Sequence, residues 1–270
     1  NLPMIPPFAD SKTVQKPNFQ TEVIRSAEHF QKIRSRVRSV GFVPTMGALH
    51  EGHRSLLKQC RNENDISVLS IFVNPTQFND PKDLEKYPTT WSADLQMARE
   101  EGVDYIFYPQ YSDLYTDNYR FKVIETDFSK KFCGQNRPGH FDGVLTVVMK
   151  LLNIVSPNKA YFGEKDFQQL TLIQDMVKAF FLPYQIVGLP TVRHSDGLAQ
   201  SSRNLLLSEG AKAKACHLHL AISQTHLTDQ EVKAKLEHLG FEVDYVESWG
   251  TRRLAAARLD GVRLIDNVEL

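Results

Sequence analysis

Short apolar runs alternate with longer amphipathic stretches along the first 190 residues of the chain. The runs are rich in β-branched and aromatic residues with little polar interruption, which is typical of strands buried on both faces. The longer stretches repeat apolar residues at helical spacing. We therefore expect strands at 40–45, 66–74, 103–109, 121–125, 159–163 and 184–190, and helices at 21–38, 49–60, 94–102, 143–155 and 168–180.

This alternation predicts an α/β fold with a Rossmann-like parallel sheet that is covered by helices on both faces. Beyond residue 202 the pattern changes to helical stretches at 208–224 and 228–240 and strand-like runs at 241–248 and 262–270, which predicts a second, smaller α+β domain. The expected organisation is a proline-rich N-terminal extension at 1–20, a Rossmann-like domain at 21–191 and a small C-terminal lid domain at 192–270.

Polar and conformationally special residues gather directly after four of the expected strands, at 44–53, 74–78, 163–166 and 190–204. In parallel sheets the carboxyl ends of the strands share one edge, and ligands bind there near the point where the strand order reverses. The sequence therefore predicts a binding site that these four segments build together.

Composition narrows the class of partner. The chain has 270 residues, of which 41% are hydrophobic and 24% charged, and its 32 basic and 32 acidic side chains cancel. A neutral chain has no overall positive field for nucleic acid or membrane surfaces, so a small-molecule substrate is favoured. Three separated cysteines form no CxxC pair, and no apolar run is long enough to span a bilayer or resembles a signal peptide. We expect a cytoplasmic protein.

His50 and His53 are three residues apart at the start of an expected helix, so their side chains share one face. Three interpretations remain open at this point. In the first, the N-terminal end of the helix binds a phosphate group. Gly47 and Gly52 would let the phosphate approach the backbone closely, and Pro44 would fix the exit from the strand. A capped helix with two solvated histidines is the second, and a metal site is the third. The metal site is the weakest, because the spacing differs from HExxH and no third ligand is adjacent.

Sequence motifs add a family resemblance. "HEGH" at 50–53 resembles the HxGH signature of nucleotidyltransferases, and "AQSSRN" at 199–204 occupies the place of the basic, serine-rich signature that accompanies it. From about Val23 to the C-terminus the chain resembles the pantothenate synthetase (pantoate–β-alanine ligase) family. The strings that carry this resemblance are "VPTMGALHEGH", "SIFVNPTQF", "RPGHFDGVLTVV", "FGEKDFQQL", "PTVR" and "DGLAQSSRN".

The resemblance implies an ATP-dependent condensation of pantoate with β-alanine to pantothenate, within coenzyme A biosynthesis. The pantoate carboxylate attacks the α-phosphorus of ATP, giving pantoyl adenylate and pyrophosphate, and the amine of β-alanine then displaces AMP. Mg²⁺ accompanying ATP and a homodimeric assembly are also implied. The reaction needs no nucleophile from the enzyme, which agrees with a sequence that has no convincing Ser–His–Asp or Cys–His set.

The resemblance assigns catalytic roles to His50, His53, Lys165 and Arg203. Both histidines would bind phosphate oxygens and stabilise the leaving pyrophosphate, and His53 matches the residue that the family treats as proton donor. Lys165 would supply a compact positive charge, and Arg203 would fork onto phosphate oxygens.

The resemblance also implies that Gln77 and Gln169 bind pantoate through their amides, which leave the attacking carboxylate nucleophilic because they are neutral. Asp166 is the candidate for ribose or the Mg²⁺ shell, and Val192 would contact adenine through its backbone. The full set expected at the ATP site is Pro44, Thr45, Met46, Gly47, His50, His53, Gly163, Lys165, Asp166, Val192, Gln200, Ser201, Ser202 and Arg203.

Gln200 departs from the family pattern, which usually has Met at this position, so the contact of that one side chain stays open. Three other functions compete with the ligase: an adenylyltransferase that retains AMP in its product, a non-catalytic nucleotide-binding module, and a zinc hydrolase built on His50 and His53. The apolar "FDGVLTVV", which suits the gem-dimethyl group of pantoate, and the two glutamines favour the ligase.

Overall fold

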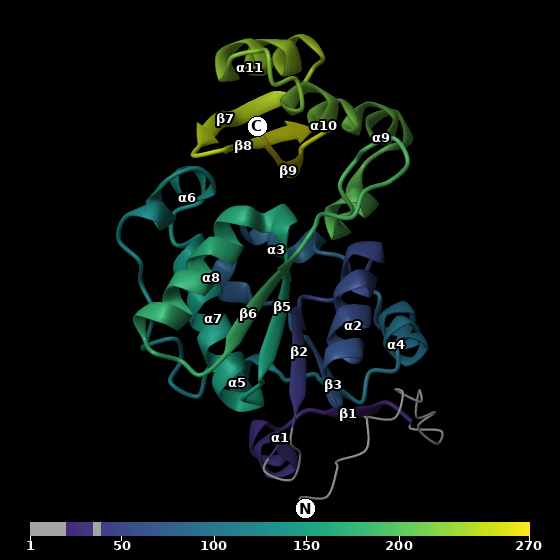
Figure 1. Ribbon diagram of the computed structural model, residues 1–270, viewed down its shortest axis with the longest axis vertical. Helices are drawn as coiled ribbons and strands as arrows, with labels where there is room; N and C mark the ends of the chain where they lie inside the picture. The colour runs from purple at the N-terminus through teal and green to yellow at the C-terminus, as the bar shows by residue number, and fades with distance from the viewer. Residues whose placement is uncertain (1–19, 35–38) are drawn as a thin grey trace, which may run out of the picture.

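The computed structural model describes residues 20–34 and 39–270 of the chain (Figure 1). Almost all of the expected extension at 1–20 therefore lies outside the described residues, as do residues 35–38 of the stretch expected to be helical at 21–38. The remaining elements of the Rossmann-like prediction can be followed in the structure.

Within the described residues, six strands form one parallel sheet in the order β1-β4-β3-β2-β5-β6. The order reverses at β2, which pairs with β3 on one side and with β5 on the other, so a crevice opens at the carboxyl ends of these strands. The strands are β1 (Glu22–Ile24), β2 (Val40–Thr45), β3 (Ile66–Ile71), β4 (Tyr105–Phe107), β5 (Lys159–Gly163) and β6 (Gln185–Leu189).

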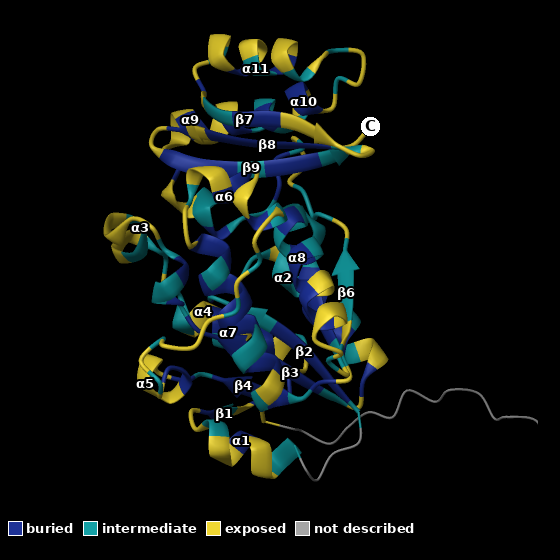
Figure 2. Ribbon diagram, turned by 90° about the vertical axis from the view of Figure 1, so that its left-hand side faces the viewer, coloured by how far each residue is buried: buried dark blue, intermediate teal, exposed yellow. Residues whose placement is uncertain are grey.

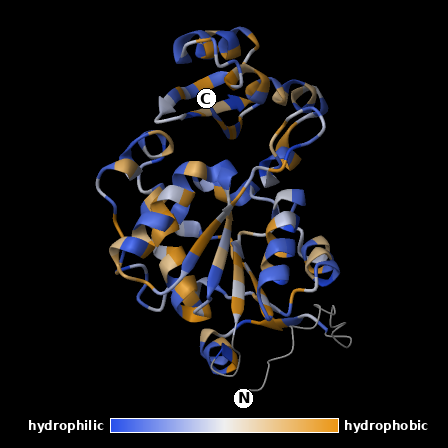
Figure 3. Ribbon diagram, viewed as in Figure 1, coloured by the Kyte–Doolittle hydropathy of each residue, from blue (hydrophilic) through white to orange (hydrophobic). Residues whose placement is uncertain are grey.

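Helices cover both faces of this sheet, as the near-continuous apolar strands predict (Figure 3). Neighbouring strand residues point to opposite faces: Phe42 packs in one buried cluster with α1, α7 and α8, and Val43 packs in another with α2 and α4. The helices are α1 (Ala27–Arg34), α2 (Glu51–Glu63), α4 (Trp91–Glu100), α7 (His140–Val155) and α8 (Phe167–Ala179), with short helices α3 (Pro81–Lys86), α5 (Tyr111–Leu114) and α6 (Cys133–Asn136). Three 3₁₀ turns complete this part: η1 (Pro75–Gln77), η2 (Phe128–Lys130) and η3 (Glu164–Asp166).

The C-terminal part confirms the smaller α+β unit and adds a strand that the sequence pattern missed. Strands β7 (Glu242–Trp249), β8 (Arg252–Leu259) and β9 (Val262–Glu269) form an antiparallel sheet with β8 in the middle. Leu254 and Ala256 of β8 belong to the core below it, whereas Ala255 and Ala257 belong to the core above it. Since both faces are buried (Figure 2), β8 lacks the polar alternation that reveals a half-exposed strand. The helices of this unit are η4 (Ser202–Leu206), α9 (Glu209–Ala215), α10 (His217–Ile222) and α11 (Asp229–His238).

Two predicted elements are wrong. Residues 22–24, expected to be helical, form the edge strand β1, which pairs with β4. Residues 121–125, expected to be a strand, form none in the structure, because no neighbouring strand of the described chain pairs with them. The predicted domain boundary near residue 191 stays a prediction.

Among the helices in residues 20–34 and 39–270, the longest is α7, with 16 residues. None of these helices is both long enough and apolar enough to cross a membrane.

Candidate active site

The four predicted segments meet at one cavity of about 740 Å³ at the carboxyl ends of β2, β3 and β5. Helices α3 and α7 form its sides, and η4 with the β8–β9 hairpin closes it from the second unit. Predicted residues that line the cavity are Pro44, Thr45, Met46, His50, His53, Gln77, Lys165, Asp166, Gln169, Ser201, Ser202 and Arg203. Gly47, Gly163, Val192 and Gln200 are not among the lining residues.

A buried carboxylate holds the loop between β2 and α2. Asp94 of α4 is 2% exposed and accepts hydrogen bonds from the backbone N–H groups of Ala48 and Leu49, each at 2.9 Å. Gly47 has a φ of +77°, and a Cβ there would lie 3.1 Å from the Asp94 carboxylate. This glycine therefore suits the turn and its packing, and its place in the ATP site stays a prediction.

His50 and His53 cap α2 and face the cavity at the same time. The Nδ1 atom of His50 accepts from the N–H of Gly52 at 3.0 Å, and Nδ1 of His53 accepts from the N–H of His50 at 3.2 Å. Because Nδ1 is the acceptor in each ring, the neutral ring carries its proton on Nε2. Gly52 leaves room for the His50 ring, since a Cβ there would approach it to 2.7 Å.

The two histidines are neutral donors. Desolvation, followed by the charges of His53 and Lys165, lowers the pKa of His50 to about 2. Desolvation, followed by the charge of Lys165, lowers the pKa of His53 to about 4. The capped-helix and phosphate interpretations are therefore compatible, because Nδ1 serves the helix and Nε2–H remains for a ligand. The helix N–H groups expected to bind phosphate are in part already bonded to these rings.

The structure gives no support to a resident metal. In the described part of the chain, no group of three or more His, Cys, Asp or Glu side chains could hold a metal ion. The Nδ1 atoms of His50 and His53 are bonded to backbone N–H groups.

Lys165 and Asp166 stand on η3, directly after β5. The Lys165 ammonium lies 3.5 Å from the Asp166 carboxylate. Asn267 of β9 donates to the carbonyl groups of Glu164 and Lys165, each at 2.9 Å. The second unit therefore helps to fix the turn that carries the lysine.

A network of amides holds Gln77. Asn74 donates to the Gln77 side-chain oxygen at 2.9 Å and to the carbonyl of Gly143 at 3.2 Å, while Tyr115 donates to the Asn74 oxygen at 2.7 Å. Since the Gln77 oxygen already accepts, its amide hydrogens are the groups left to donate. Gln169 lines the same cavity, and the apolar wall beside them consists of Phe72, Val144, Val147, Val148, Leu151 and Phe162.

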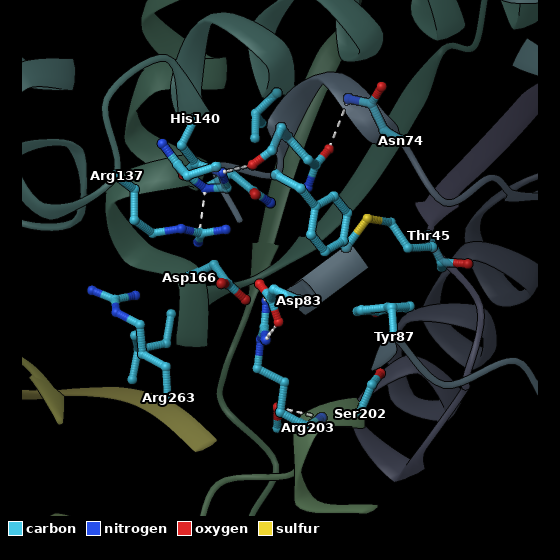
Figure 4. Close-up of a pocket in the computed structure, with 18 of the residues that line it drawn as sticks. Thr45, Asn74, Asp83, Tyr87, Arg137, His140, Asp166, Ser202, Arg203 and Arg263 are labelled. Atoms are coloured by element: carbon cyan, nitrogen blue, oxygen red, sulfur yellow. Dashed lines mark hydrogen bonds and ion pairs between the residues drawn. The ribbon is translucent and has the colours of Figure 1, made fainter. Parts of the chain in front are cut away.

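Arginine and serine side chains approach from η4. Asp83 of α3 accepts from both terminal nitrogens of Arg203, at 2.9 Å for Nη2 (Figure 4). Burial raises the pKa of Asp83, but the Arg203 guanidinium outweighs it, and the net shift is downward. Ser202 donates to the carbonyl of Ala48 at 2.9 Å, so its hydroxyl would have to give up this partner to donate to a phosphate, and that role stays a prediction. Ser201 accepts from the N–H of Arg203.

Sequence reasoning missed several residues that line the cavity, among them Asn74, Asp83, Tyr87, Arg137, His140 and Arg263 (Figure 4). Asn74, Arg137 and His140 lie within quoted motifs and could have been found there. Asp83 comes from a segment with no local signal and Arg263 from a predicted strand, and only the fold brings these two to the site.

The protein has a doubly wound parallel sheet, and the cavity at its switch point is lined by neutral imidazole donors, a lysine and side-chain amides. These features define an α/β protein that binds small anionic substrates. The family model described as pantoate-beta-alanine ligase matches residues 19–269, and the chain belongs to this family.

Relatives and solved structures agree with this family. The chain is 60% identical over 251 residues to a pantothenate synthetase of Bdellovibrio bacteriovorus, covering 93% of this chain and 100% of the relative. It is 47% identical to one of Coxiella burnetii over 250 residues, which cover 92% of this chain and 96% of that one. A Francisella tularensis pantoate-beta-alanine ligase, solved with beta-gamma ATP and beta-alanine, superposes with a TM-score of 0.87 at 39% identity, covering 92% and 97% of the two chains. A Thermus thermophilus pantothenate synthetase superposes with a TM-score of 0.85 at 36% sequence identity. The match covers 92% of this chain and 99% of that one.

These findings confirm the predicted fold class and the predicted activity. The protein is a ligase that joins pantoate and β-alanine in an ATP-dependent reaction. The adenylyltransferase, binding-module and zinc-hydrolase alternatives are set aside by this family membership.

Proposed function

We propose that the ligation runs in two steps within this one cavity. The pantoate carboxylate first attacks the α-phosphorus of ATP, forming pantoyl adenylate and releasing pyrophosphate. The amine of β-alanine then attacks the acyl carbon, forming the amide bond and releasing AMP. The observation that carries the proposal is the convergence of two neutral imidazole donors, His50 and His53, with Lys165 and Gln77 on one cavity.

The phosphate end of this cavity combines neutral and charged donors. His50 and His53 would donate from Nε2 to phosphate oxygens, and these bonds would strengthen as charge develops on the departing pyrophosphate. A bound triphosphate would raise the pKa of His53 and enable it to protonate the leaving group. Lys165 and Arg203 would add positive charge, and Arg203 would exchange its Asp83 partner for phosphate oxygens.

The pantoate end would be the amide network with its apolar wall. Gln77 and Gln169 would donate to the hydroxyl and carboxylate groups of pantoate, and the apolar side chains of α7 would accommodate its gem-dimethyl group. Neutral amides orient the carboxylate without the strong charge pairing that would weaken it as a nucleophile.

The adenosine end rests on the family pattern. Pro44, Thr45 and Met46 line the cavity beside the histidines, where the nucleotide would lie. The backbone N–H of Gln200 donates to the carbonyl of Val192 at 2.9 Å, and these two residues would border adenine. A Cβ on Gly163 would meet no atom within 4 Å, which leaves space for the nucleotide there.

Mg²⁺ would enter with ATP. The donors present fit a metal held mainly by phosphate oxygens, because Asp166 contributes one carboxylate with 44% side-chain exposure and lies beside the cavity. The ion would neutralise part of the phosphate charge, while Asp166 would orient its water shell.

We also include a homodimer in the proposal. Phe121 and Ile124 are 67% and 57% exposed in a segment that has no strand partner within the described chain. A second copy that pairs with residues 121–125 would cover these side chains and satisfy the strand pattern of the sequence.

The proposed location is the cytoplasm. Cys60, Cys133 and Cys216 are all free thiols, which suits a reducing compartment.

The test is an assay with purified protein, ATP, Mg²⁺, pantoate and β-alanine, from which each component is omitted in turn. Labelled pyrophosphate should exchange into ATP when pantoate is present and β-alanine absent, and AMP release with pantothenate formation should require β-alanine. Exchange that needs β-alanine would contradict the adenylate intermediate. AMP retained in the final product would contradict the two-step ligation as a whole.

A further inference from the structure

Arg137 lies on the cavity wall in the link between α6 and α7, with His140 beside it (Figure 4). It also borders a narrow side cavity beneath the second sheet. Neither the family comparison nor the site assignments above give this arginine a role.

His140 fixes the guanidinium relative to the pantoate end. Nδ1 of His140 lies 2.8 Å from the carbonyl oxygen of Gln77 and must donate to it, so Nε2 is the acceptor. Nη1 of Arg137 lies 3.3 Å from this Nε2 atom. Desolvation, followed by the charge of Arg137, lowers the pKa of His140 to about 3, so the ring stays neutral and keeps this orientation.

The other arginines that line the cavity are paired with carboxylates. Arg203 is bound by Asp83, and Nε of Arg263 donates to Asp244 at 2.7 Å. Arg258 lies 4.0 Å from the same Asp244. Within residues 20–34 and 39–270, Arg137 is the cavity arginine that has no carboxylate within 4.0 Å.

A half-buried guanidinium with one neutral partner retains several donors for an anion. The lysines of α3 that line the cavity, Lys82 and Lys86, are exposed, so water screens their charge more strongly. Arg137 therefore combines partial burial with the lack of a carboxylate partner, and these two properties favour the binding of a carboxylate from a substrate.

One substrate charge has no partner in the two-step proposal. The phosphates of ATP and the carboxylate of pantoate are assigned, but the carboxylate of β-alanine is not, and it keeps its charge throughout the reaction. We propose that Arg137 binds the carboxylate of β-alanine, with His140 as the positioning residue. This inference rests on the proposed roles of the histidines and glutamines.

The chemistry of β-alanine fits this place. Two methylene groups separate its amine from its carboxylate, so the carboxylate anchor must lie close to the acyl carbon that the amine attacks. The His140 bridge ties Arg137 to the backbone of Gln77, whose side chain would hold pantoate. A planar guanidinium binds a carboxylate through two parallel hydrogen bonds. This pairing also selects against amine substrates that have no carboxylate.

The test compares two amine substrates at saturating ATP and pantoate: β-alanine, and its amide 3-aminopropanamide, in which a neutral carboxamide replaces the carboxylate. Arg137→Ala should reduce the preference in kcat/KM for the acid over the amide by about 10- to 100-fold, the loss expected for a charged hydrogen bond. Arg137→Lys should retain part of the preference. Pantoate-dependent exchange of pyrophosphate should stay within about twofold of the unaltered protein.

Arg258→Ala is the matched control, because this arginine lines the same cavity but has a carboxylate neighbour. It should keep the preference for the acid. An unchanged preference in Arg137→Ala would overturn the inference, and so would a loss of exchange with a raised KM for ATP, which would make Arg137 a phosphate ligand. The exchange reaction of the unaltered protein tests the two-step proposal separately, so the two failures are distinguishable.

Discussion

The two walls of the cavity present donors of different kinds. On the wall formed by the parallel sheet, His50 and His53 are neutral, and their second nitrogens are bonded to the backbone of α2. On the wall formed by the second unit, Arg203 and Arg263 are charged and paired with carboxylates.

The difference concerns what a ligand must displace. A neutral ring that is already oriented by the backbone can donate to a phosphate without losing another partner. A charged side chain that is paired with a carboxylate must exchange one anion for another, so the gain is the difference between the two. We expect the two neutral histidines to govern rate and the paired arginines of the second unit to govern affinity.

The largest effect is expected for His53. Replacement by Ala removes the Nε2 donor and should slow adenylation by about 100-fold or more, because a positioned donor to the leaving group is lost. Single-turnover formation of pyrophosphate measures this step directly. Thermal unfolding checks that the fold survives the loss of a helix-capping bond.

Two further variants separate the roles of the two nitrogens of His53. His53→Asn keeps an acceptor near the position of Nδ1, and His53→Gln keeps an amide donor near that of Nε2. If the ring serves only as a cap, Asn will restore the rate and Gln will not. The opposite order supports a donor to phosphate.

A smaller effect, mainly on affinity, is expected at the Arg203–Asp83 pair. Arg203→Ala should raise the KM for ATP by about 30-fold, as expected for loss of a charge-assisted pair of hydrogen bonds. Asp83→Asn should lower that KM by about threefold, because the arginine then has no competing carboxylate. In an Arg203→Ala background the Asp83 change should have no such effect. A weaker affinity for ATP in Asp83→Asn would instead make Asp83 part of the ATP site.

Gln77 should act on one substrate. Gln77→Ala should raise the KM for pantoate by about tenfold, since the lost amide makes a neutral hydrogen bond and leaves Asn74 with an unpaired donor. The KM for ATP should not change. If only the affinity for ATP falls, Gln77 belongs to a different part of the cavity.

A site residue could be predicted from the sequence where it lies in a continuous motif, and could not where only the folded chain brings it to the cavity. His50, His53 and Lys165 lie on continuous motifs at strand ends, and the parallel sheet necessarily brings such ends together. Asp83 and Arg263 lie 180 residues apart in the chain, and both line the cavity. No spacing rule in the sequence brings two such residues together, because their meeting depends on how the second unit packs against the first.

The fold itself shows the same limit. Near-continuous apolar strands such as β2 and β3 were found, but β1 has only three residues and its pairing with β4 decides its state. The central strand β8 was missed because alanines on both faces obscure its period. The segment at 121–125 carries a strand pattern without a partner in the described chain, which is why local sequence could not settle its structure.

The smallest effect concerns stability, and it depends on the neutrality of the buried rings. The pKa of His140 is about 3 in the folded state, against about 6.5 in an unfolded chain. Between these values the unfolded state binds more protons than the folded state, so the free energy of unfolding falls as the pH falls. For one such histidine the loss between pH 7 and pH 5 is about 2 kcal/mol.

Replacing His140 by Gln removes this proton difference. Although the variant loses hydrogen bonds at every pH, the drop in its free energy of unfolding between pH 7 and pH 5 should be smaller than that of the unaltered protein by about 2 kcal/mol. Urea titration at the two pH values measures it, and His238→Gln, on the exposed side of α11, should leave the drop unchanged. An equal drop in His140→Gln would mean that His140 is charged when folded. Its Nε2 could then not accept from Arg137, and the bridge from Arg137 through His140 to the backbone of Gln77 would be broken.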